Sequence, residues 1–412
     1  MLVGARRFIP ARASLAASIL IALAASSANA ESASDPDEAS SEPLAARPIR
    51  KPINLEIEAP STDFTKNIAK ALNDIYDKYL SFKKELGTDY NVQYSMPVSI
   101  LPQWGAPNGG PGVLSLTYTP NITWAPFTNT AFGSGLFTFQ MQQTQFWSST
   151  STQSQQAKLG LIIPPNIQPT NFREYNQAMY TQTFPGSWNW LSVTVGQYAF
   201  SAYDSNQYAG NAQTNFISNP LAGNATQTYP NGGRGAYAQA ATPDQQFTFA
   251  AGFQNASNVS ATTLRRSAPS ARRYAYFIAG EWAPKLLGGG SYELLAYSQP
   301  SVPQVPGGSQ GVSFNAVQNI DPKWGLFLRA NGASVGRNKL DQVGLGVFWD
   351  KTNLKAVSQP ARSAEWGSEL YYNYVLFKGL WLTPDVQLYF DPALPPGAGP
   401  AAVFTIRTTA FF

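Results

Sequence analysis

The chain has 412 residues, of which 43% are hydrophobic, 13% aromatic and only 13% charged, and its formal net charge is +4. It contains neither histidine nor cysteine, which excludes Ser-His-Asp triads, HExxH zinc sites, thiolate nucleophiles and disulfide frameworks. Carboxylate-based glycoside hydrolysis is the catalytic chemistry that remains open, and a charged fraction about half of the usual one indicates that part of the surface does not face water.

Residues 1–30 have the three parts of a secretory signal peptide. The leader carries three arginines, an apolar run follows at 15–25, and the A-x-A cleavage signal lies at 28–30. The adjacent Arg6 and Arg7 leave a twin-arginine export route open as an alternative. Cleavage removes three of the 28 basic residues and none of the 24 acidic ones, so the mature chain is nearly neutral and no nucleic-acid partner is predicted.

Two segments of different character follow the signal peptide. Residues 31–60 are rich in Ser, Pro, Ala and acidic side chains, which predicts a disordered linker. Residues 61–87 predict the one convincing helix of the chain. Ser61 or Thr62 can cap its start, lysines occupy its last turns and Gly87 can end it.

The predicted helix is amphipathic, with one seam of apolar side chains spaced by threes and fours. The seam consists of Phe64, Ile68, Ala71, Ile75, Tyr79, Phe82 and Leu86. Three arrangements fit this pattern: a helix packed on its own domain, a short periplasmic coiled coil between subunits, or a plug-like segment near the mouth of a pore. The coiled-coil arrangement would make the protein a homo-oligomer, with a trimer as the expected form.

Residues 88–412 predict a domain made of strands. No stretch after the leader approaches the roughly 18 to 20 apolar residues that a membrane helix needs. Segments of alternating polarity are instead separated by Gly, Pro, Asn and Ser. Fifteen candidate strands begin near residues 90, 112, 135, 157, 188, 234, 246, 272, 290, 311, 324, 340, 365, 380 and 401. Because bacterial single-chain barrels have an even strand number, we predict an all-β fold: a transmembrane antiparallel β-barrel of about 16 strands with an N-terminal periplasmic helix.

Alternation gives each candidate strand an apolar and a polar face. Phe137 and Phe139 share one face, while Thr138 and Gln140 share the other. A soluble sandwich could alternate too, but it would need neither a signal peptide, nor so few charges, nor so many aromatic residues at strand ends. We interpret these aromatic residues as the interfacial girdles of a membrane barrel. They are Trp124, Trp147, Trp188, Trp282, Trp349, Tyr374 and Tyr389.

The last ten residues, VFTIRTTAFF, predict the closing strand. Phe404, Ile406 and Phe412 share a face that we expect to meet lipid, while Thr405 and Arg407 would face the pore. A terminal aromatic residue on such a strand is typical of outer-membrane barrels. The expected location is therefore the outer membrane of a Gram-negative bacterium, with outer-membrane lipid and the barrel assembly machinery as partners.

A motif in residues 200–239 combines D-x-N-x-Y-A-x-N with T-x-F, Asn-rich turns and Tyr-Pro. Its residues are Asp204, Asn206, Tyr208, Ala209, Asn211, Thr214, Phe216, Asn219, Asn224, Tyr229 and Pro230. Together with GLFLRA at 325–330 and the C-terminal ELYY and LTPDVQLYFDP stretches, the motif resembles the carbohydrate-selective porin family known as OprB. The resemblance covers roughly 190–412, and it implies a sixteen-stranded outer-membrane porin through which sugars diffuse.

Strand parity predicts which side chains of this barrel face its lumen. Polar side chains there would hydrogen-bond sugar hydroxyls, and aromatic rings would cover the C–H face of the sugar. The predicted sugar-binding residues are Arg273, Phe277, Glu281, Phe327, Arg329, Asn331, Glu369, Tyr371, Trp381, Asp385, Gln387 and Arg407. The alternative for the charged members is that they simply balance one another.

The predicted function is passive diffusion of mono- or oligosaccharides through a polar, aromatic-lined pore. A general, non-specific porin is the main alternative, because it would share every feature except sugar binding. A barrel enzyme acting on glycans would need two carboxylates at a defined separation, and the sequence indicates no such pair. We therefore predict no catalysis, no cofactor and no metal ion.

Overall fold

The computed structural model describes most of the chain beyond the N-terminal region. The described residues are 63–107, 110, 112–161, 164–204, 211–224, 227, 229–256, 273–285, 288–302, 307–320, 325–335, 338–345, 347–351, 364–377, 379–394 and 399–412. The predicted signal peptide (1–30) and linker (31–60) lie outside them, as do Asn206, Tyr208 and Ala209 of the motif.

Strands dominate the described residues. The helices are α2 (Asp63–Tyr90), α3 (Thr152–Leu159) and α4 (Asn219–Ala222), with 3-10 turns η1 (Gly186–Trp188) and η2 (Phe200–Tyr203). The first ten strands are β1 (Val92–Ser95), β2 (Val98–Ala106), β3 (Val113–Tyr118), β4 (Asn121–Thr130), β5 (Gly133–Phe146), β6 (Phe172–Thr183), β7 (Leu191–Tyr198), β8 (Gly233–Ala241), β9 (Phe247–Asn255) and β10 (Tyr274–Trp282). The other nine are β11 (Gly290–Gln299), β12 (Ser309–Asn319), β13 (Gly325–Val335), β14 (Asn338–Leu345), β15 (Val347–Lys351), β16 (Ala364–Tyr371), β17 (Tyr374–Phe377), β18 (Leu380–Tyr389) and β19 (Ala401–Ala410). None of the described helices is long and apolar enough to cross a membrane.

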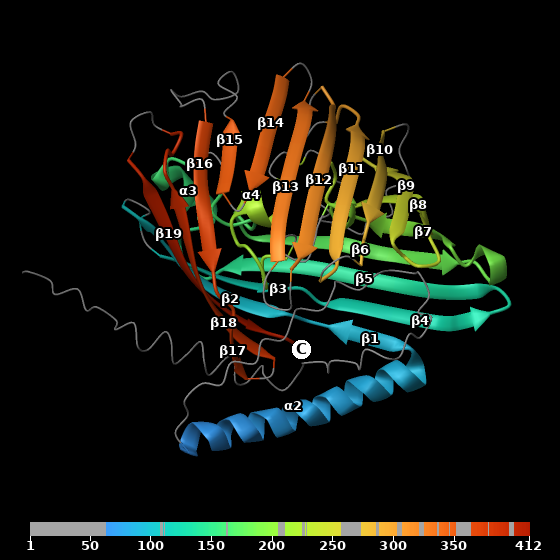
Figure 1. Cartoon of the computed structure of the whole chain (residues 1–412). Coiled ribbons are helices and arrows are strands. Elements are labelled where there is room, and N and C mark those ends of the chain that lie inside the picture. Colours follow the sequence, from blue (N-terminus) through green and yellow to red (C-terminus); the bar gives the residue numbers. More distant parts are fainter. Residues whose placement is uncertain are drawn as a thin grey trace, which may run out of the picture.

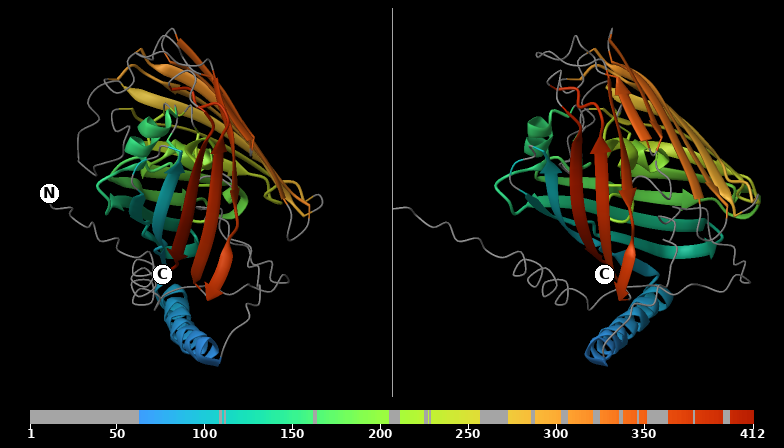
Figure 2. Two further views of the ribbon diagram at one scale, coloured as in Figure 1. Left: turned by 90° about the vertical axis from the view of Figure 1, so that its left-hand side faces the viewer. Right: turned by 60° about the vertical axis from the view of Figure 1, so that its left-hand side comes forward.

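The strands close into a barrel (Figures 1 and 2). Neighbouring strands pair antiparallel around the whole ring, and β19 returns to pair with β2. Short turns such as 131–132 and 242–246 lie at one end, which we call the short-turn end. The longer connections 147–171 and 199–232 leave the opposite, long-loop end. Closure pairs the backbone of the edge strands, which a barrel in lipid requires.

We call each position in the ring of the barrel wall a stave, whether one strand or two occupy it. Three staves each consist of two strands in line. β1 continues into β2, β3 into β4, and β16 into β17; accordingly β5 pairs with both β3 and β4, and β18 with both β16 and β17. The first two breaks fall at Pro97 and Pro120, whose nitrogens carry no hydrogen for a ladder bond. The nineteen strands of the described residues thus form sixteen staves, the predicted number.

Three local predictions were wrong although the number of staves was right. The strand predicted from residue 157 belongs to α3, which Gly160 ends in a left-handed conformation with φ 72°. The strand β6 was missed because FREYNQAMYTQT is polar on both faces and alternates weakly. The segment predicted as one strand from residue 340 is two strands, with β14 ending at Leu345 and β15 beginning at Val347.

The helix α2 lies outside the barrel, across its short-turn end (Figures 1 and 2). It continues beyond Gly87 to Tyr90 and ends before Asn91, whose positive φ of 54° suits the residue after a helix. The ring of Tyr79 packs edge-on against Tyr94 of β1, with centroids 6.0 Å apart. The helix thus lies near one mouth of the barrel without entering the lumen.

Burial separates the inner and outer faces of the barrel wall. On β5, Phe137 is 45% exposed on the outside, whereas the next residue, Thr138, is 5% exposed on the inside. Four of the predicted girdle tryptophans are exposed: Trp124, Trp147, Trp188 and Trp282. The side chain of Trp349 lies outside the described part of the chain, and Tyr374 is half-buried.

Two aromatic residues differ from the prediction. Tyr389 is not a girdle residue, because it shares the inward parity of Gln387 and is buried beside Leu159. Phe412 is not exposed to lipid but is only 7% exposed, since it packs with Leu380 and Ala410 beyond the end of β19.

Gly235 of β8 lies close to the backbone of β9, so a substitution at this position tests the pairing of the two strands. A Cβ atom at this position would lie 1.8 Å from the carbonyl oxygen of Phe253 and 2.6 Å from the Cα of Gln254. We expect Gly235→Ala to lower the free energy of unfolding by about 1–3 kcal/mol through overpacking, measured by urea unfolding in lipid vesicles. Gly280→Ala on β10 is the matched control, because its nearest neighbour would be at 3.6 Å; equal stability of the two variants would contradict the register.

Candidate functional site

Two long connections fold back into the barrel. The connection 147–171 carries α3, and 199–232 carries η2 and α4, both visible inside the ring of strands (Figure 1). The Ser151 side chain caps α3 by accepting from the amide of Ser154 at 3.3 Å. The amide of Ile167 donates to the carbonyl of Ile217 at 3.1 Å and so links the two connections. Residues 199–204 and 211–224 of the second connection are called the lumen segment below.

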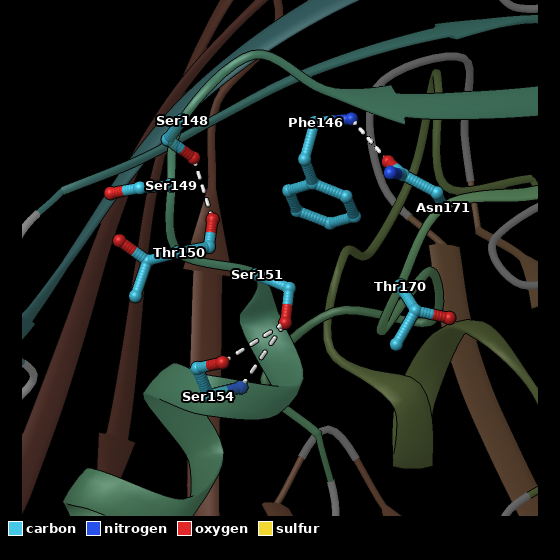
Figure 3. A pocket seen from close by; sticks show the side chains of 8 residues that line it. All are labelled: Phe146, Ser148, Ser149, Thr150, Ser151, Ser154, Thr170 and Asn171. Carbon is cyan, nitrogen blue, oxygen red and sulfur yellow. Dashed lines mark hydrogen bonds between the residues drawn. The ribbon is translucent and has the colours of Figure 1, made fainter.

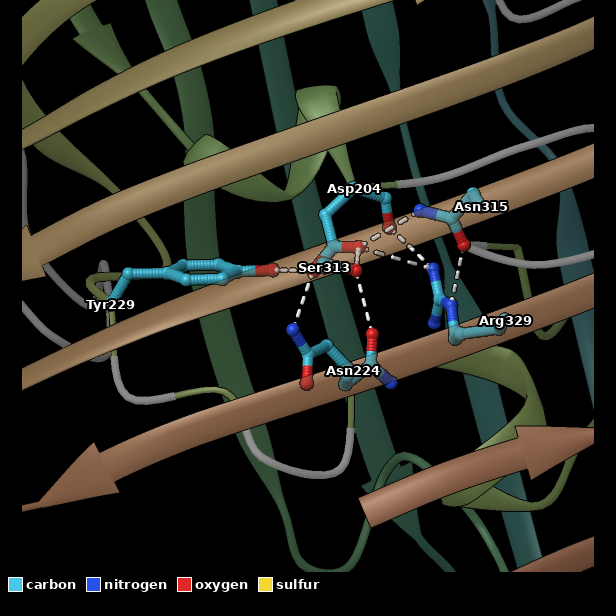
Figure 4. Close-up of polar contacts among 7 residues, drawn as sticks. Asp204, Asn224, Tyr229, Ser313, Asn315 and Arg329 are labelled. Atoms are coloured by element: carbon cyan, nitrogen blue, oxygen red, sulfur yellow. Dashed lines mark hydrogen bonds and ion pairs between the residues drawn. The ribbon is translucent and has the colours of Figure 1, made fainter. Parts of the chain in front are cut away.

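Asp204 of the lumen segment is the hub of a buried polar network (Figure 4). From the same connection, the Asn224 amide donates to its carboxylate at 2.7 Å and the Tyr229 hydroxyl donates at 2.6 Å. Burial, followed by the charge of Asp204, raises the pKa of Tyr229 well above its ordinary value. The phenol therefore stays protonated and keeps donating its hydrogen to the carboxylate.

The barrel wall supplies the remaining partners of Asp204. On β12, Ser313 donates to the carboxylate and the Asn315 amide donates at 3.0 Å. On β13, Arg329 forms an ion pair with the carboxylate at 3.6 Å and donates to the backbone carbonyl of Asp204. Arg329 is 0% exposed, and Asn331 is buried beside Ser313. The predicted lumen residue Arg329 thus meets the lumen segment rather than open water, and Asn331 is bonded to Ser313 of the same network.

A second sector of the wall, from β16 to β19, holds the other part of the lumen segment. Arg407 of β19 is also 0% exposed and donates to the carbonyls of Ala212 at 2.7 Å and Asn215 at 2.6 Å. Glu369 of β16 accepts from the amides of Ile217 at 2.6 Å and Ser218 at 3.0 Å. The predicted residues Arg407 and Glu369 therefore lie together, both bonded to the backbone of residues 212–218.

One group of aromatic side chains fills the lumen near the start of this segment. Phe277 of β10 is buried by Phe200 and Tyr203, whose ring centroids lie 4.7 and 4.9 Å away. Tyr198 and Tyr237 complete the cluster. Phe277 points inward as predicted, but its ring is covered by protein.

A second aromatic group is half-buried. Phe216 of the lumen segment packs against Phe327 of β13 at 5.9 Å and edge-on against Tyr371 of β16 at 5.0 Å. The guanidinium of Arg407 lies 5.9 Å from the centre of the Tyr371 ring. We call Phe216, Phe327 and Tyr371 the aromatic shelf. Phe327 and Tyr371 are predicted lumen residues, and Phe216 belongs to the lumen segment.

Of the other predicted residues, Asp385 and Gln387 adjoin Tyr371 and Glu369 across the ladder between β16 and β18, and the remaining three are dispersed. Asp385 and Gln387 are buried on β18 and joined by a hydrogen bond of 3.3 Å. Trp381 is buried edge-on against Phe411 near the short-turn end. Glu281 of β10 is half-buried and accepts from Ser291 at 2.9 Å. Arg273 is exposed just before β10 and lies apart from the rest.

A small cleft lies at the long-loop end, between the end of β5 and α3 (Figure 3). It is lined by Phe146, Ser148, Ser149, Thr150, Ser151, Ser154, Thr170 and Asn171. The hydroxyls of Ser148 and Ser151 are used within the loop, where they bond Thr150 and Ser154. In the described part of the chain, no group of three or more acidic side chains is placed to hold a metal ion.

Because Asp204 is the hub of a buried polar network, we expect its replacement to lower the free energy of unfolding strongly. Asp204→Ala would leave the buried guanidinium of Arg329 without its ionic partner, which costs about 3–5 kcal/mol in comparable buried pairs. We expect urea unfolding in lipid vesicles to show a loss of that order. Asp244→Ala, on the turn between β8 and β9, is the control because that carboxylate is fully exposed. A loss no greater than that of the control would contradict the assigned role of the hub.

Comparison with known proteins agrees with this architecture. The family model of the carbohydrate-selective porin, OprB family, matches residues 332–412. Porin AaxA of Chlamydia pneumoniae is 30% identical over 347 residues, which cover 77% of this chain and 78% of the relative. Porin AaxA of Chlamydia felis is 29% identical over 408 residues, covering 92% and 88%.

A solved structure shows the same fold. The high-pH structure of Pseudomonas putida OprB superposes with a TM-score of 0.61 at 15% identity, covering 80% of this chain and 96% of that one. Sequence relatives, family model and fold thus agree with a porin barrel. The chain belongs to the OprB family of porins and is an outer-membrane β-barrel channel.

Proposed function

We propose that this porin lets carbohydrates diffuse passively across the outer membrane. The observation that carries the proposal is the half-buried aromatic shelf of Phe216, Phe327 and Tyr371 inside a lumen lined with amides and hydroxyls. A pyranose presents C–H groups on its faces and hydroxyls around its rim. Aromatic rings suit the faces, and uncharged amides suit the hydroxyls.

Hydrogen-bonding groups for such a solute lie on the inner wall. Gln140 of β5 and Gln177 of β6 face each other in register, and both are half-buried. By contrast, Arg329 and Arg407 are fully buried and bonded to the lumen segment. We therefore move the proposed sugar contacts from these arginines to the shelf and the glutamines.

The aromatic shelf also favours a sugar-selective porin over a general porin. Weak binding of a solute inside a pore is what makes a channel selective for it, whereas a general porin needs only an open aqueous lumen. We propose no catalytic role, because Glu369 and Asp385 are buried and Glu369 holds two backbone amides.

Phe216→Ala tests the shelf. We expect the wild-type channel to conduct salt in planar bilayers and its current to fall as glucose or maltose is added. Loss of one aromatic face should weaken sugar affinity by about fivefold, the equivalent of about 1 kcal/mol. Phe137→Ala, on the outer face of β5, is the matched control and should leave the affinity unchanged.

The outcomes assign the channel to one class. A conducting channel whose current no sugar reduces would be a general porin. A purified, folded protein that conducts nothing would contradict both classes.

We further propose that copies of this chain associate through α2 into a trimer. Ile75 and Phe82 are 47% and 50% exposed, and their spacing of seven residues places them on one face of the helix. Copies inserted in one membrane present this face at the same height, so that another copy is the occupant that fits it.

The assembly proposal is tested with a double variant on that face. Ile75→Glu with Phe82→Glu should convert the trimer to a monomer in detergent, measured by light scattering, while single-channel conductance persists. The polar-face variant Ser81→Glu is the control. A wild-type protein that is monomeric would overturn the proposal.

A further inference from the structure

The backbone of residues 212–218, which we call the tip of the lumen segment, is held by side chains of the wall. Arg407 donates to the carbonyls of Ala212 and Asn215, as described above. The Thr409 hydroxyl donates to the carbonyl of Gln213 at 2.8 Å, and the Asn373 amide donates to that of Thr214 at 2.8 Å. With the two amides bonded to Glu369, six backbone groups of seven residues have wall side chains as partners.

Asn373 is oriented for this contact by two other wall residues. It lies at the break between β16 and β17, where the strand ladder is interrupted. Thr383 donates to its side-chain oxygen at 2.6 Å, and Arg407 donates to the same oxygen at 3.2 Å. Because the oxygen has these donors, the amide nitrogen is the atom that faces the carbonyl of Thr214.

Gln213 extends the anchoring to the other two breaks in the wall. Its amide nitrogen donates to the carbonyls of Pro97 and Thr117, each at 3.1 Å, and its oxygen accepts from Thr119 at 2.7 Å. These residues flank the points where β1 passes into β2 and β3 into β4. The side chain of Gln213 is buried, so one residue joins the tip to two interrupted staves.

Phe216 lies in the middle of this anchored backbone. Its neighbours Asn215 and Ile217 are both bonded to the wall through their backbone groups. The position of the Phe216 ring against Tyr371 is therefore determined by side chains that are themselves buried. Arg407 can serve two carbonyls at once because its Nη1 carries two hydrogens, while its Nη2 donates to Asn373.

We propose that Asn373, Arg407 and Gln213 are positioning residues that control sugar affinity through Phe216 without touching the sugar. The proposal rests on the proposed sugar porin and deepens it, because it assigns the predicted lumen residue Arg407 an indirect role. An indirect role has a thermodynamic signature. Removing an anchor should matter only while the Phe216 ring is present.

A double-mutant cycle measures that signature. Asn373→Ala should weaken the sugar-dependent block of current about as much as Phe216→Ala, by about fivefold. The double variant should be no weaker than Phe216→Ala alone. Additive losses would mean that Asn373 contacts the sugar directly, and an unchanged affinity in Asn373→Ala would mean that the anchor is irrelevant; either result overturns the proposal.

A second measurement does not depend on sugar. The chain has no cysteine, so Phe216→Cys creates a single thiol for labelling with a water-soluble maleimide. Adding Asn373→Ala should raise the labelling rate severalfold, because the released tip exposes position 216. An unchanged rate would overturn the inference even if sugars block the wild-type channel, whereas a raised rate without any sugar block would support the anchoring and contradict only the proposed function.

Two variants control for general disruption. Ser218→Ala lies in the same tip but removes a hydroxyl that has no hydrogen-bond partner among the described residues, so both readouts should be unchanged. Thr409→Val removes one donor to the carbonyl of Gln213 and substitutes for Asn373→Ala if that variant fails to fold. Heat-dependent migration on SDS gels identifies folded barrels among all variants.

Discussion

A chain segment that leaves the strands and crosses the lumen must find hydrogen-bond partners for its own backbone. Strands in the barrel wall satisfy each other's backbone groups, but residues 212–218 lie outside the strand ladders of the described chain, and buried backbone groups without partners are costly. The wall meets this requirement with long polar side chains that point inward. Arg407 and Glu369 supply four of the contacts, and they bond a carbonyl or an amide rather than water. This requirement explains why ionisable side chains are concentrated on the inner face of staves that carry little charge elsewhere.

The hydrogen bonds to the lumen segment also determine which side chains of the inner wall can still contact a solute. Arg329 and Arg407 are committed to the lumen segment, and Phe277 is covered by Phe200 and Tyr203. The half-buried surface that remains is aromatic at the shelf and amide-rich along β5 and β6. We propose that such a surface favours neutral, hydroxyl-rich molecules over ions, because it offers ring faces and uncharged donors rather than a strong electrostatic field. The breaks in three staves belong to the same arrangement, since Gln213 bonds the carbonyl of Pro97 that the first break leaves outside the regular ladder.

Sequence patterns predicted the properties that depend on neighbouring residues. Alternation placed Phe137 and Thr138 on opposite faces, and the even-number rule turned fifteen candidate strands into sixteen staves. Alternation also placed Arg329, Glu369 and Arg407 inward correctly. It failed at β6, where polar residues occupy both faces, and at α3, where a short apolar run ends in Gly160 instead of continuing as a strand. Alternation could not predict the role of Asp204, because its partner Arg329 lies 125 residues away in the chain. The D-x-N and T-x-F motif was the only local signal that this connection matters.

The buried charges also change how variants of this channel should be understood. A guanidinium buried beside a carboxylate is stabilising only while both are present, and removing one partner leaves the other desolvated and unpaired. Substituting Arg329 or Glu369 would therefore alter transport by disturbing the lumen segment, whatever the solute. Loss of flux in such a variant is no sign of direct contact. A side chain that touches the solute has to be partly exposed, and its replacement has to change affinity while the barrel keeps its stability. Among the aromatic residues predicted to face the lumen, Phe327 and Tyr371 are partly exposed and can touch a solute, whereas Phe277 is buried. Phe216 packs against Phe327 and Tyr371, but the sequence indicated it only as part of a motif.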